Sequence, residues 1–380
     1  MSYLDENAEL VKFLCEQHSV PKYFTEVFNY ITNGISDAPT KKIGIIGDKF
    51  YSLYVRAFGL TPIILDGGSY YMGENSNDIF PQISDPVAKA TIGLLLDKEL
   101  DLASKLDAVL VVVTNDSYKK VIHYLEELNI KVIYTEPHSY LLESIPLSHT
   151  INQLSILNAI SKLTTKPFNS SILKQEVSGY KQAYEIMESE KWKLMPTFVQ
   201  SFLAYTLQLD DDKESWCEEV EQYLETRSDK PSSTQITLIG SPIAFPNTKM
   251  YNILNDVGIT HFDDKCLDVP DFSEVDEDAG DIGLVASCFK AQYRNMFKAQ
   301  TVCSPDRVQF DENTKGIVYY LLKGQASEAY EAERMEEVAI AAGVPFLCVE
   351  TDYTDTDKEQ IKIRIEAFHE MLSGSLSKVG

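Results

Sequence analysis

The sequence has 380 residues, of which 44% are hydrophobic, and a formal net charge of −24. This length predicts roughly two or three domains with ordinary buried cores. The negative charge argues against binding to nucleic acid or to an anionic membrane, because both require a basic surface. The sequence has no apolar run near the ~20 residues that span a bilayer and no signal-peptide pattern at its start, so we expect a cytoplasmic protein.

The first half of the chain predicts N-terminal helices in residues 1–40 and an α/β lobe in residues 41–148. In the lobe, short apolar runs alternate with helical patterns, which is typical of a parallel sheet covered on both faces. The predicted strands are 42–46, 62–65, 108–113 and 131–134. The predicted helices are 50–58, 87–96 and 118–128.

Residues 149–230 predict a helical bridge. Its helical spacing includes one pattern formed by Trp192, Met195, Phe198, Phe202 and Leu203. Residues 210–213 predict a polar turn between two helices of the bridge.

Residues 231–380 predict a second α/β lobe with a closing C-terminal helix. The predicted strands are 236–239, 260–262, 316–321 and 345–349. The predicted helices are 246–257, 282–297, 326–342 and 358–372, with an acidic loop at 263–281. The predicted fold is therefore α/β, with two Rossmann-like or flavodoxin-like parallel-sheet lobes joined by a helical segment.

Candidate ligand-binding turns follow several predicted strands, where α/β folds commonly bind ligands. They are the turn at Asp48, the turn Gly240, Ser241, Pro242 and Ile243, and the turns that contain Asn115 and Gln325. Free backbone N–H groups at a helix start suit a phosphate or a carboxylate. Helix capping is the commoner role of such turns, and none of them matches a GxGxxG or P-loop motif.

The cysteines and histidines predict no metal site. The six cysteines include no CxxC pair, and the six histidines lack the spacing of metal ligands. In a cytoplasmic chain we expect reduced and mostly buried thiols.

Three segments resemble the 2-hydroxyacyl-CoA dehydratase D-component family, which is related to benzoyl-CoA reductase subunits. Residues 238–249 read LIGSPIAFPNTK, similar to a turn of that family. Residues 341–345 read AAGVP, 349–354 read VETDYT and 363–368 read IRIEAF, similar to the end of the family's sequences. Residues 56–62 read RAFGLTP and 65–69 read LDGGS, similar to a segment of its first lobe.

The resemblance implies a pair of homologous subunits, each of which normally holds a [4Fe-4S] cluster through three cysteines. An ATP-driven activator supplies an electron, and a radical reaction removes water from a 2-hydroxyacyl-CoA. The family's cysteine positions correspond here to Asp85, Asn115 and Gln325. Cys266 and Cys303 lie in segments similar to other family loops and are not assigned as ligands. Because clusters are normally held by thiolates, we expect no cofactor in this chain.

Three functions are compatible with this pattern. The chain could be a working subunit, that is, a lyase acting with a cluster-bearing partner. It could instead be a cluster-free, supporting paralogue in a hetero- or homodimer with a homologous subunit. The third alternative is a protein that kept the fold to bind an acyl-CoA or another small molecule without the chemistry. The three replaced cysteines favour the supporting paralogue.

Overall fold

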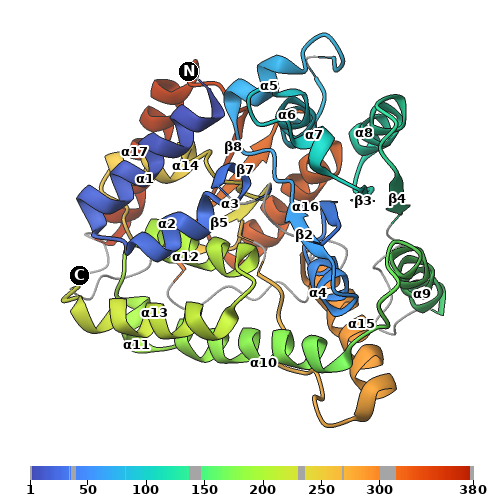
Figure 1. Ribbon diagram of the computed structural model, residues 1–380. Helices are drawn as coiled ribbons and strands as arrows, with labels where there is room; N and C mark the ends of the chain where they lie inside the picture. Colours follow the sequence, from blue (N-terminus) through green and yellow to red (C-terminus); the bar gives the residue numbers. More distant parts are fainter. Residues whose placement is uncertain are drawn as a thin grey trace.

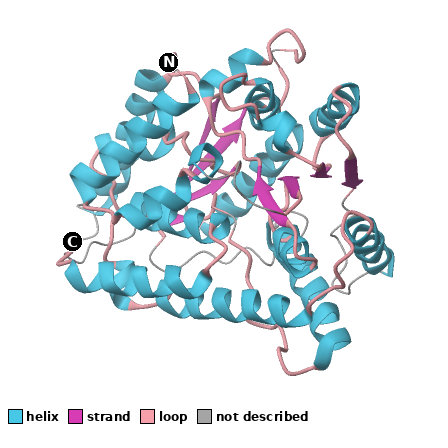
Figure 2. Cartoon of the chain, in the orientation of Figure 1, coloured by secondary structure: helices cyan, strands magenta, loops and turns pink. Residues whose placement is uncertain are grey.

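The structure is a computed structural model, and it describes residues 2–33, 35, 40–81, 83–136, 147–229, 236–267, 269–299 and 314–376. Two four-stranded parallel sheets lie among helices, as Figures 1 and 2 show. Both sheets have the same strand order, with the second strand along the chain at one edge and the first strand beside it. The prediction of two parallel-sheet lobes is confirmed. The predicted domain boundaries stay a prediction.

The first sheet has the order β2-β1-β3-β4. Its strands are β1 (Lys42–Ile46), β2 (Thr61–Ile64), β3 (Ala108–Val112) and β4 (Val132–Thr135). The helices of this lobe are α4 (Tyr51–Ala57), α5 (Tyr70–Asn75), α6 (Pro86–Leu96), α7 (Leu102–Lys105) and α8 (Asp116–Glu127). Every residue of β3 is buried, which explains its continuous run of apolar side chains in the sequence.

The second sheet has the order β6-β5-β7-β8. Its strands are β5 (Ile236–Gly240), β6 (Asp263–Asp264), β7 (Gly316–Leu322) and β8 (Phe346–Thr351). The helices of this lobe are α14 (Lys249–Asp256), α15 (Gly280–Ala299), α16 (Ala326–Ala342) and α17 (Lys358–Leu376). Helix α15 reaches across to the first lobe, where the ring of Phe289 lies 5.9 Å from that of Tyr54 on α4.

In the second lobe one predicted strand is misplaced, and one predicted helix begins later than expected. The strand predicted at 260–262 lies instead at Asp263–Asp264. The earlier residues do not join the sheet, because their carbonyl groups bond to Thr197 instead. Its backbone N–H donates to the carbonyl of Thr260, and its hydroxyl donates to that of Phe262. The helix predicted from 246 begins at Lys249, because the preceding residues form an irregular turn in which Pro246 makes an isolated parallel bridge with Gly68.

The remaining helices form the N-terminal segment and the bridge between the lobes. They are α1 (Tyr3–His18), α2 (Lys22–Phe28), α3 (Tyr30–Asn33), α9 (Leu147–Ser161), α10 (Ser170–Met187), α11 (Glu190–Lys193), α12 (Thr197–Leu209) and α13 (Lys213–Thr226). The single helical pattern predicted across Trp192 and Phe202 is divided between α11 and α12, because Pro196 cannot continue a helix.

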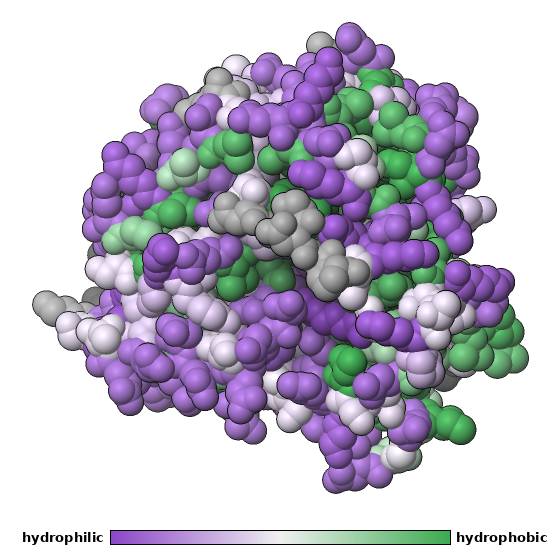
Figure 3. Space-filling model, in the orientation of Figure 1, coloured by the Kyte–Doolittle hydropathy of each residue, from purple (hydrophilic) through white to green (hydrophobic). Residues whose placement is uncertain are grey.

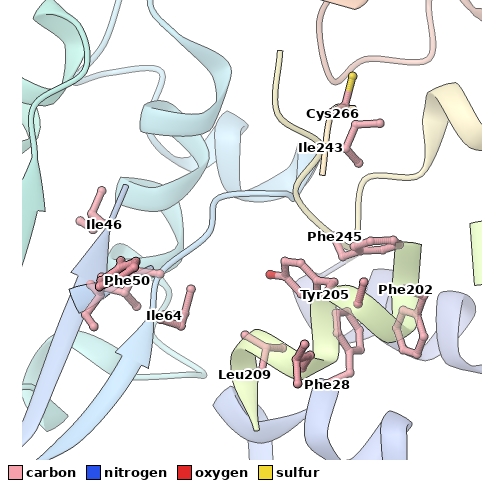
Figure 4. Packing of buried hydrophobic residues seen from close by; sticks show 14 of the residues in the cluster. Phe28, Ile46, Phe50, Ile64, Phe202, Tyr205, Leu209, Ile243, Phe245 and Cys266 are labelled. Carbon is pink, nitrogen blue, oxygen red and sulfur yellow. The ribbon is translucent and has the colours of Figure 1, made fainter. Parts of the chain in front are cut away.

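Aromatic packing joins the bridge to the second lobe. Phe245, in the turn after β5, lies 5.1 Å from the ring of Tyr205 and 5.6 Å from that of Phe202, both on α12. Phe28 of α2 packs 5.4 Å from Phe202 on the other side (Figure 4). Burial of such large rings is the main stabilising contribution at this contact.

Asp210 and Lys213 of the predicted polar turn are buried in a network of charges, whereas Asp211 and Asp212 are exposed. Arg56 of α4 forms a 2.9 Å ion pair with Glu176 of α10 and donates a 3.0 Å hydrogen bond to the carbonyl of Asp210. The Tyr23 hydroxyl donates to the Asp210 carboxylate at 2.6 Å. Burial, with repulsion from Arg56, lowers the pKa of Lys213 to about 8. The turn therefore ties α2, α4, α10 and α13 together.

Hydrophilic residues cover most of the face shown in Figure 3, in keeping with the charge of −24. None of the helices in the described part of the chain combines the length and apolar character needed to cross a membrane.

Helix α1 is attached to the first lobe through Glu6. Its carboxylate accepts a hydrogen bond from the Ser69 hydroxyl and another, at 3.3 Å, from the backbone N–H of Tyr70. Burial raises the pKa of Glu6 from 4.5 to about 7. The folded protein therefore holds this proton more tightly than the unfolded chain, so the contribution of Glu6 to stability falls as pH rises from 4.5 to 7.

Glu6→Gln is expected to remove this pH dependence. At pH 8 the variant should be more stable than the parent by about 2 kcal/mol, allowing for the partial exposure of the carboxylate. Near pH 4.5 the two proteins should be nearly equal in stability. Urea unfolding at several pH values measures the difference, and Glu9→Gln at an exposed position of the same helix is the control. Parallel pH profiles for the parent and Glu6→Gln would contradict the prediction.

Candidate functional site

The carboxyl ends of the two sheets face each other, and we call this contact the seam. The turn after β2 meets the turn after β5 through the bridge between Gly68 and Pro246. The turn after β7 meets the residues before α6, since a Cβ atom at Gly324 would lie 2.4 Å from the carbonyl oxygen of Ile83. Ligands of α/β folds bind beyond the carboxyl ends of the strands, so the seam is the expected place for a site.

The three predicted cluster positions come together at the seam. Asp85 is the N-cap residue of α6, Asn115 that of α8 and Gln325 that of α16. The Asn115 amide nitrogen donates to Asp85 Oδ2 at 2.7 Å, and the Gln325 amide nitrogen donates to Asp85 Oδ1 at 3.2 Å. Residues 30 and 240 positions away thus converge on one carboxyl group, and we call Asp85, Asn115 and Gln325 the triad.

Local hydrogen bonds hold Asp85 and Asn115 in place. Asp85 Oδ1 also accepts the backbone N–H of Val87 at 2.9 Å, and the Asp85 backbone N–H donates to the Ser117 hydroxyl at 3.2 Å. Asn115 Oδ1 accepts the backbone N–H of Ser117 at 2.9 Å. The bonds that Asp85 and Asn115 accept from the N–H groups of Val87 and Ser117 are the usual N-caps of α6 and α8. The same two side chains therefore cap these helices and meet each other at the seam.

The charge of the triad is set by burial and by the helices. Asp85 is 1% exposed and Gln325 is 6% exposed. Burial raises the pKa of Asp85, while the hydrogen bonds from Asn115 and Val87 oppose the shift. Three helix N-termini carry partial positive charge toward this point, and a negative group there is stabilised by them. Asp85 is the acidic group that the chain itself supplies.

The triad does not fit an iron–sulfur cluster. Its donor set is one carboxylate and two carboxamides, whereas such clusters are held by thiolates or occasionally imidazoles. Both carboxylate oxygens of Asp85 already accept N–H groups of the chain. Over the residues that the structure describes, no group of three or more His, Cys, Asp or Glu side chains could hold a metal ion.

Among the residues that the structure describes, the cysteines do not supply a replacement set. Cys217, Cys266 and Cys288 are buried, and burial raises the pKa of each thiol. Cys266 lies in the second lobe, where its carbonyl accepts the backbone N–H of Ile243 at 3.2 Å. Cys303 lies outside the described residues.

The turn after β5 uses its polar groups within the second lobe. The Ser241 hydroxyl is buried and accepts the backbone N–H of Leu322 at 2.8 Å, while its own N–H donates to the carbonyl of Tyr320 at 2.7 Å. Gly240 has φ +122°, and a Cβ atom there would lie 2.1 Å from the Tyr320 carbonyl oxygen, so only glycine fits. Pro242 is exposed and Ile243 is buried. Their role as a ligand-binding turn stays a prediction.

Asp48 lies at the end of β1, apart from the triad's hydrogen bonds. Its carboxylate accepts the Gln292 amide nitrogen at 2.5 Å and the backbone N–H of Phe50 at 2.9 Å. Gln292 belongs to α15, so this turn also joins segments far apart in the sequence. The neighbouring Lys49 forms a 2.8 Å ion pair with Asp66 at the end of β2, a contact that the sequence analysis missed.

Sequence analysis also missed the role of Lys249. Its ammonium group is buried and donates to the Thr351 hydroxyl at 2.7 Å and to the carbonyl of Asp352 at 3.2 Å. It also contacts the Asp357 carboxylate and the carbonyl of Thr354. Lys249 thus links the turn after β5 with the turn after β8. Its only signal in the sequence was a single lysine at the end of residues 238–249, a segment that is otherwise uncharged.

Comparison with known proteins agrees with the resemblance seen in the sequence. Residues 54–372, most of the chain and parts of both lobes, match the family described as 2-hydroxyglutaryl-CoA dehydratase, D-component. All three residues of the triad lie inside the matched range. No curated protein matches the chain.

Proposed function

Since the chain belongs to the 2-hydroxyglutaryl-CoA dehydratase D-component family, we propose that it is a cluster-free, supporting subunit of a dehydratase of this type. In this proposal it pairs with a homologous subunit that holds the cluster and helps to bind an acyl-CoA. A component of a multi-subunit enzyme can keep its fold and its partner after losing its own redox group. Fold and family do not by themselves fix the chemistry, so the proposal rests on the seam.

The observation that supports the proposal is the triad at the three replaced cysteine positions. The amide N–H groups of Asn115 and Gln325 donate to the two oxygens of Asp85, so this carboxylate is engaged within the triad, while the Gln325 amide oxygen has no hydrogen-bond partner. The Asp85 carboxyl group occupies the point at which three helix N-termini favour a negative group. An anionic cluster would compete with this carboxylate for the same place.

The cofactor part of the proposal is tested by reconstitution. The purified chain is incubated with iron and sulfide without oxygen, desalted, and assayed for iron and visible absorbance. We expect a colourless protein without bound iron. A brown protein that keeps about four iron atoms per chain would contradict the cluster-free part of the proposal, since that is the content of a [4Fe-4S] cluster.

The partner part is tested by co-purification. A tagged form of the chain is co-expressed with a family member that has cysteines at the three corresponding positions. We expect the two chains to elute together and the complex to bind a 2-hydroxyacyl-CoA more tightly than coenzyme A alone, measured by calorimetry. A chain that elutes alone and binds neither compound would exclude the supporting role.

A further inference from the structure

Three large apolar side chains form an exposed stripe on α9, away from the seam. Leu147 is 74% exposed, and Ile151 and Leu154 are each 53% exposed. Their spacing of four and three residues places them on one face of the helix. Helix α9 lies at the right-hand edge of the molecule in Figure 1, and hydrophobic residues lie at that edge in Figure 3. Contiguous exposed apolar surface marks sites of interaction, whereas single exposed apolar residues are ordinary.

The composition of α9 is that of a buried helix. Of the helices with eight or more residues in the described part of the chain, only α9 and α12 lack Asp, Glu, Lys and Arg. Every residue of α12 except Gln200 is buried. A helix that is apolar on several sides is normally covered all round. This chain covers the inner side of α9 and leaves the stripe exposed, so a second molecule is needed to cover it.

Polar side chains on the inner side of α9 fix the orientation of the helix. The Gln153 amide nitrogen donates to the Tyr51 hydroxyl at 3.0 Å, and both residues are buried. The buried His149 ring bonds through Nε2 to the carbonyl of Phe289 on α15, at 3.2 Å. Rotation of the helix to bury the stripe in this chain would break these bonds. The stripe is therefore held outward by the fold itself.

The charge of the chain favours a second copy as the molecule that covers this face. The exposed residues of α9 are Leu147, Ser148, Ile151, Leu154, Ser155 and Asn158, none of which is charged. A partner selected by charge would need charged groups here to recognise. Two copies with a net charge of −24 repel each other, and this repulsion is smallest where the facing surfaces carry no charge. An apolar stripe is also complementary to itself, as a two-fold symmetric interface requires.

We propose that α9 is the contact face of a homodimer, in which the stripe packs antiparallel against the same stripe of a second copy. Leu147, Ile151 and Leu154 of each copy form the centre of this contact. The stripe has far fewer residues than the ~20–30 that each side of a standard interface contributes, so we expect a dissociation constant on the order of 10 µM. The site is separate from the triad, and the proposal stands whether or not the chain supports a dehydratase.

Sedimentation velocity tests the dimer over a range of protein concentrations around the expected dissociation constant. Ile151→Glu should raise this constant by at least about tenfold, because it places two like charges in one desolvated contact. Ile363→Glu is the matched control, since Ile363 is 64% exposed on α17 between Lys362 and Arg364. The control should dimerise like the parent. A parent that stays monomeric at every concentration, or equal dimerisation of the two variants, would overturn the proposal.

Cross-linking tests the symmetry of the contact. Ile151 is the middle residue of the stripe, so in an antiparallel pair it lies nearest to its own copy. In a chain with Cys15→Ser, which removes an exposed thiol, Ile151→Cys should form a disulfide between the two copies on oxidation with copper phenanthroline. Ile363→Cys in the same background should stay uncrosslinked. A dimer in which peptide mapping finds no disulfide between the introduced thiols of Ile151→Cys would refute the two-fold contact at α9.

The other candidate occupant is the homologous, cluster-bearing subunit of the proposed dehydratase. Co-elution of that subunit with the parent and with Ile151→Glu distinguishes the two occupants. We expect the substitution to abolish the homodimer and to leave co-elution with the homologous subunit unchanged. A parent that is monomeric alone, and whose co-elution with the homologous subunit is lost in Ile151→Glu, would assign the stripe to that subunit and reject the second copy.

Discussion

Replacing Lys249 with methionine is expected to lower the free energy of unfolding by about 3–5 kcal/mol, because it removes one partner of a buried ion pair. The lysine side chain is 3% exposed and the Asp357 side chain is 20% exposed. Methionine keeps the aliphatic length but cannot donate to the Thr351 hydroxyl or to the carbonyls of Asp352 and Thr354. Asp357 would be left with a charge that the surrounding groups only partly satisfy.

Lys323→Met is the matched control for this experiment. Lys323 also contacts Asp352 and Asp357, at 3.1 Å and 3.8 Å, but its side chain is 47% exposed. An exposed pair of this kind typically contributes about 0.2–1 kcal/mol, so the control should unfold almost like the parent. Urea unfolding of the three proteins at one pH measures the difference. Equal losses in the two variants would show that burial of Lys249 is not what gives the contact its strength.

The same lysine explains a feature of the sequence. The segments LIGSPIAFPNTK and VETDYT are about 100 residues apart, and each was recognised separately. In the structure Lys249, the last residue of the first segment, binds Thr351 and Asp352 of the second. Two segments that support the family resemblance are therefore parts of one contact between the turns that follow β5 and β8.

The sequence predicted most of the fold because the central strands are apolar and the helices have clear starts. Strand β1 and helix α16 were predicted with the bounds that the structure shows, and β3 and β7 differ by one residue at one end. Strand β6 was misplaced because it is only two residues long and both are aspartates, which strands usually lack. The short helices α5 and α7 were missed because six and four residues carry too little periodicity.

The site was less accessible to prediction from the sequence. The resemblance selected Asp85, Asn115 and Gln325, but nothing in the local sequence showed that their side chains would bond to one another. Such contacts depend on how the two lobes face each other, and this arrangement is set by packing between distant segments. The buried charges at Asp210 and Lys213 were misread for the same reason, since a run of charged residues usually indicates a solvated turn.

Replacing all three residues of the triad with cysteine is expected to give a protein that binds an iron–sulfur cluster. The variant carries Asp85→Cys, Asn115→Cys and Gln325→Cys. After anaerobic reconstitution and desalting it should be brown and hold about four iron atoms per chain, as a [4Fe-4S] cluster does. The side chain of cysteine is shorter than that of Asn or Gln. Three thiolates at these positions would therefore leave space between their sulfur atoms, at the point where the two amides now meet the carboxylate.

Two features of the seam favour this outcome. The three positions are already fixed by the starts of α6, α8 and α16, so the backbone need not move to bring them together. The substitution removes the Asp85 carboxylate, and an anionic thiolate-bound cluster would then interact with the three helix N-termini in its place. The loss of the N-cap bonds to Val87 and Ser117 costs about 2 kcal/mol in total, which a bound cluster can offset.

The control replaces the same residues with serine, which has nearly the same size but no thiolate. The serine variant and the parent should both stay colourless under the same conditions. Circular dichroism establishes that each variant is folded before the iron content is compared. A folded cysteine variant without iron would show that Asp85, Asn115 and Gln325 do not occupy the family's ligand positions. That result would remove the main reason to treat the chain as a dehydratase subunit that lost its cluster, while leaving its fold and family membership in place.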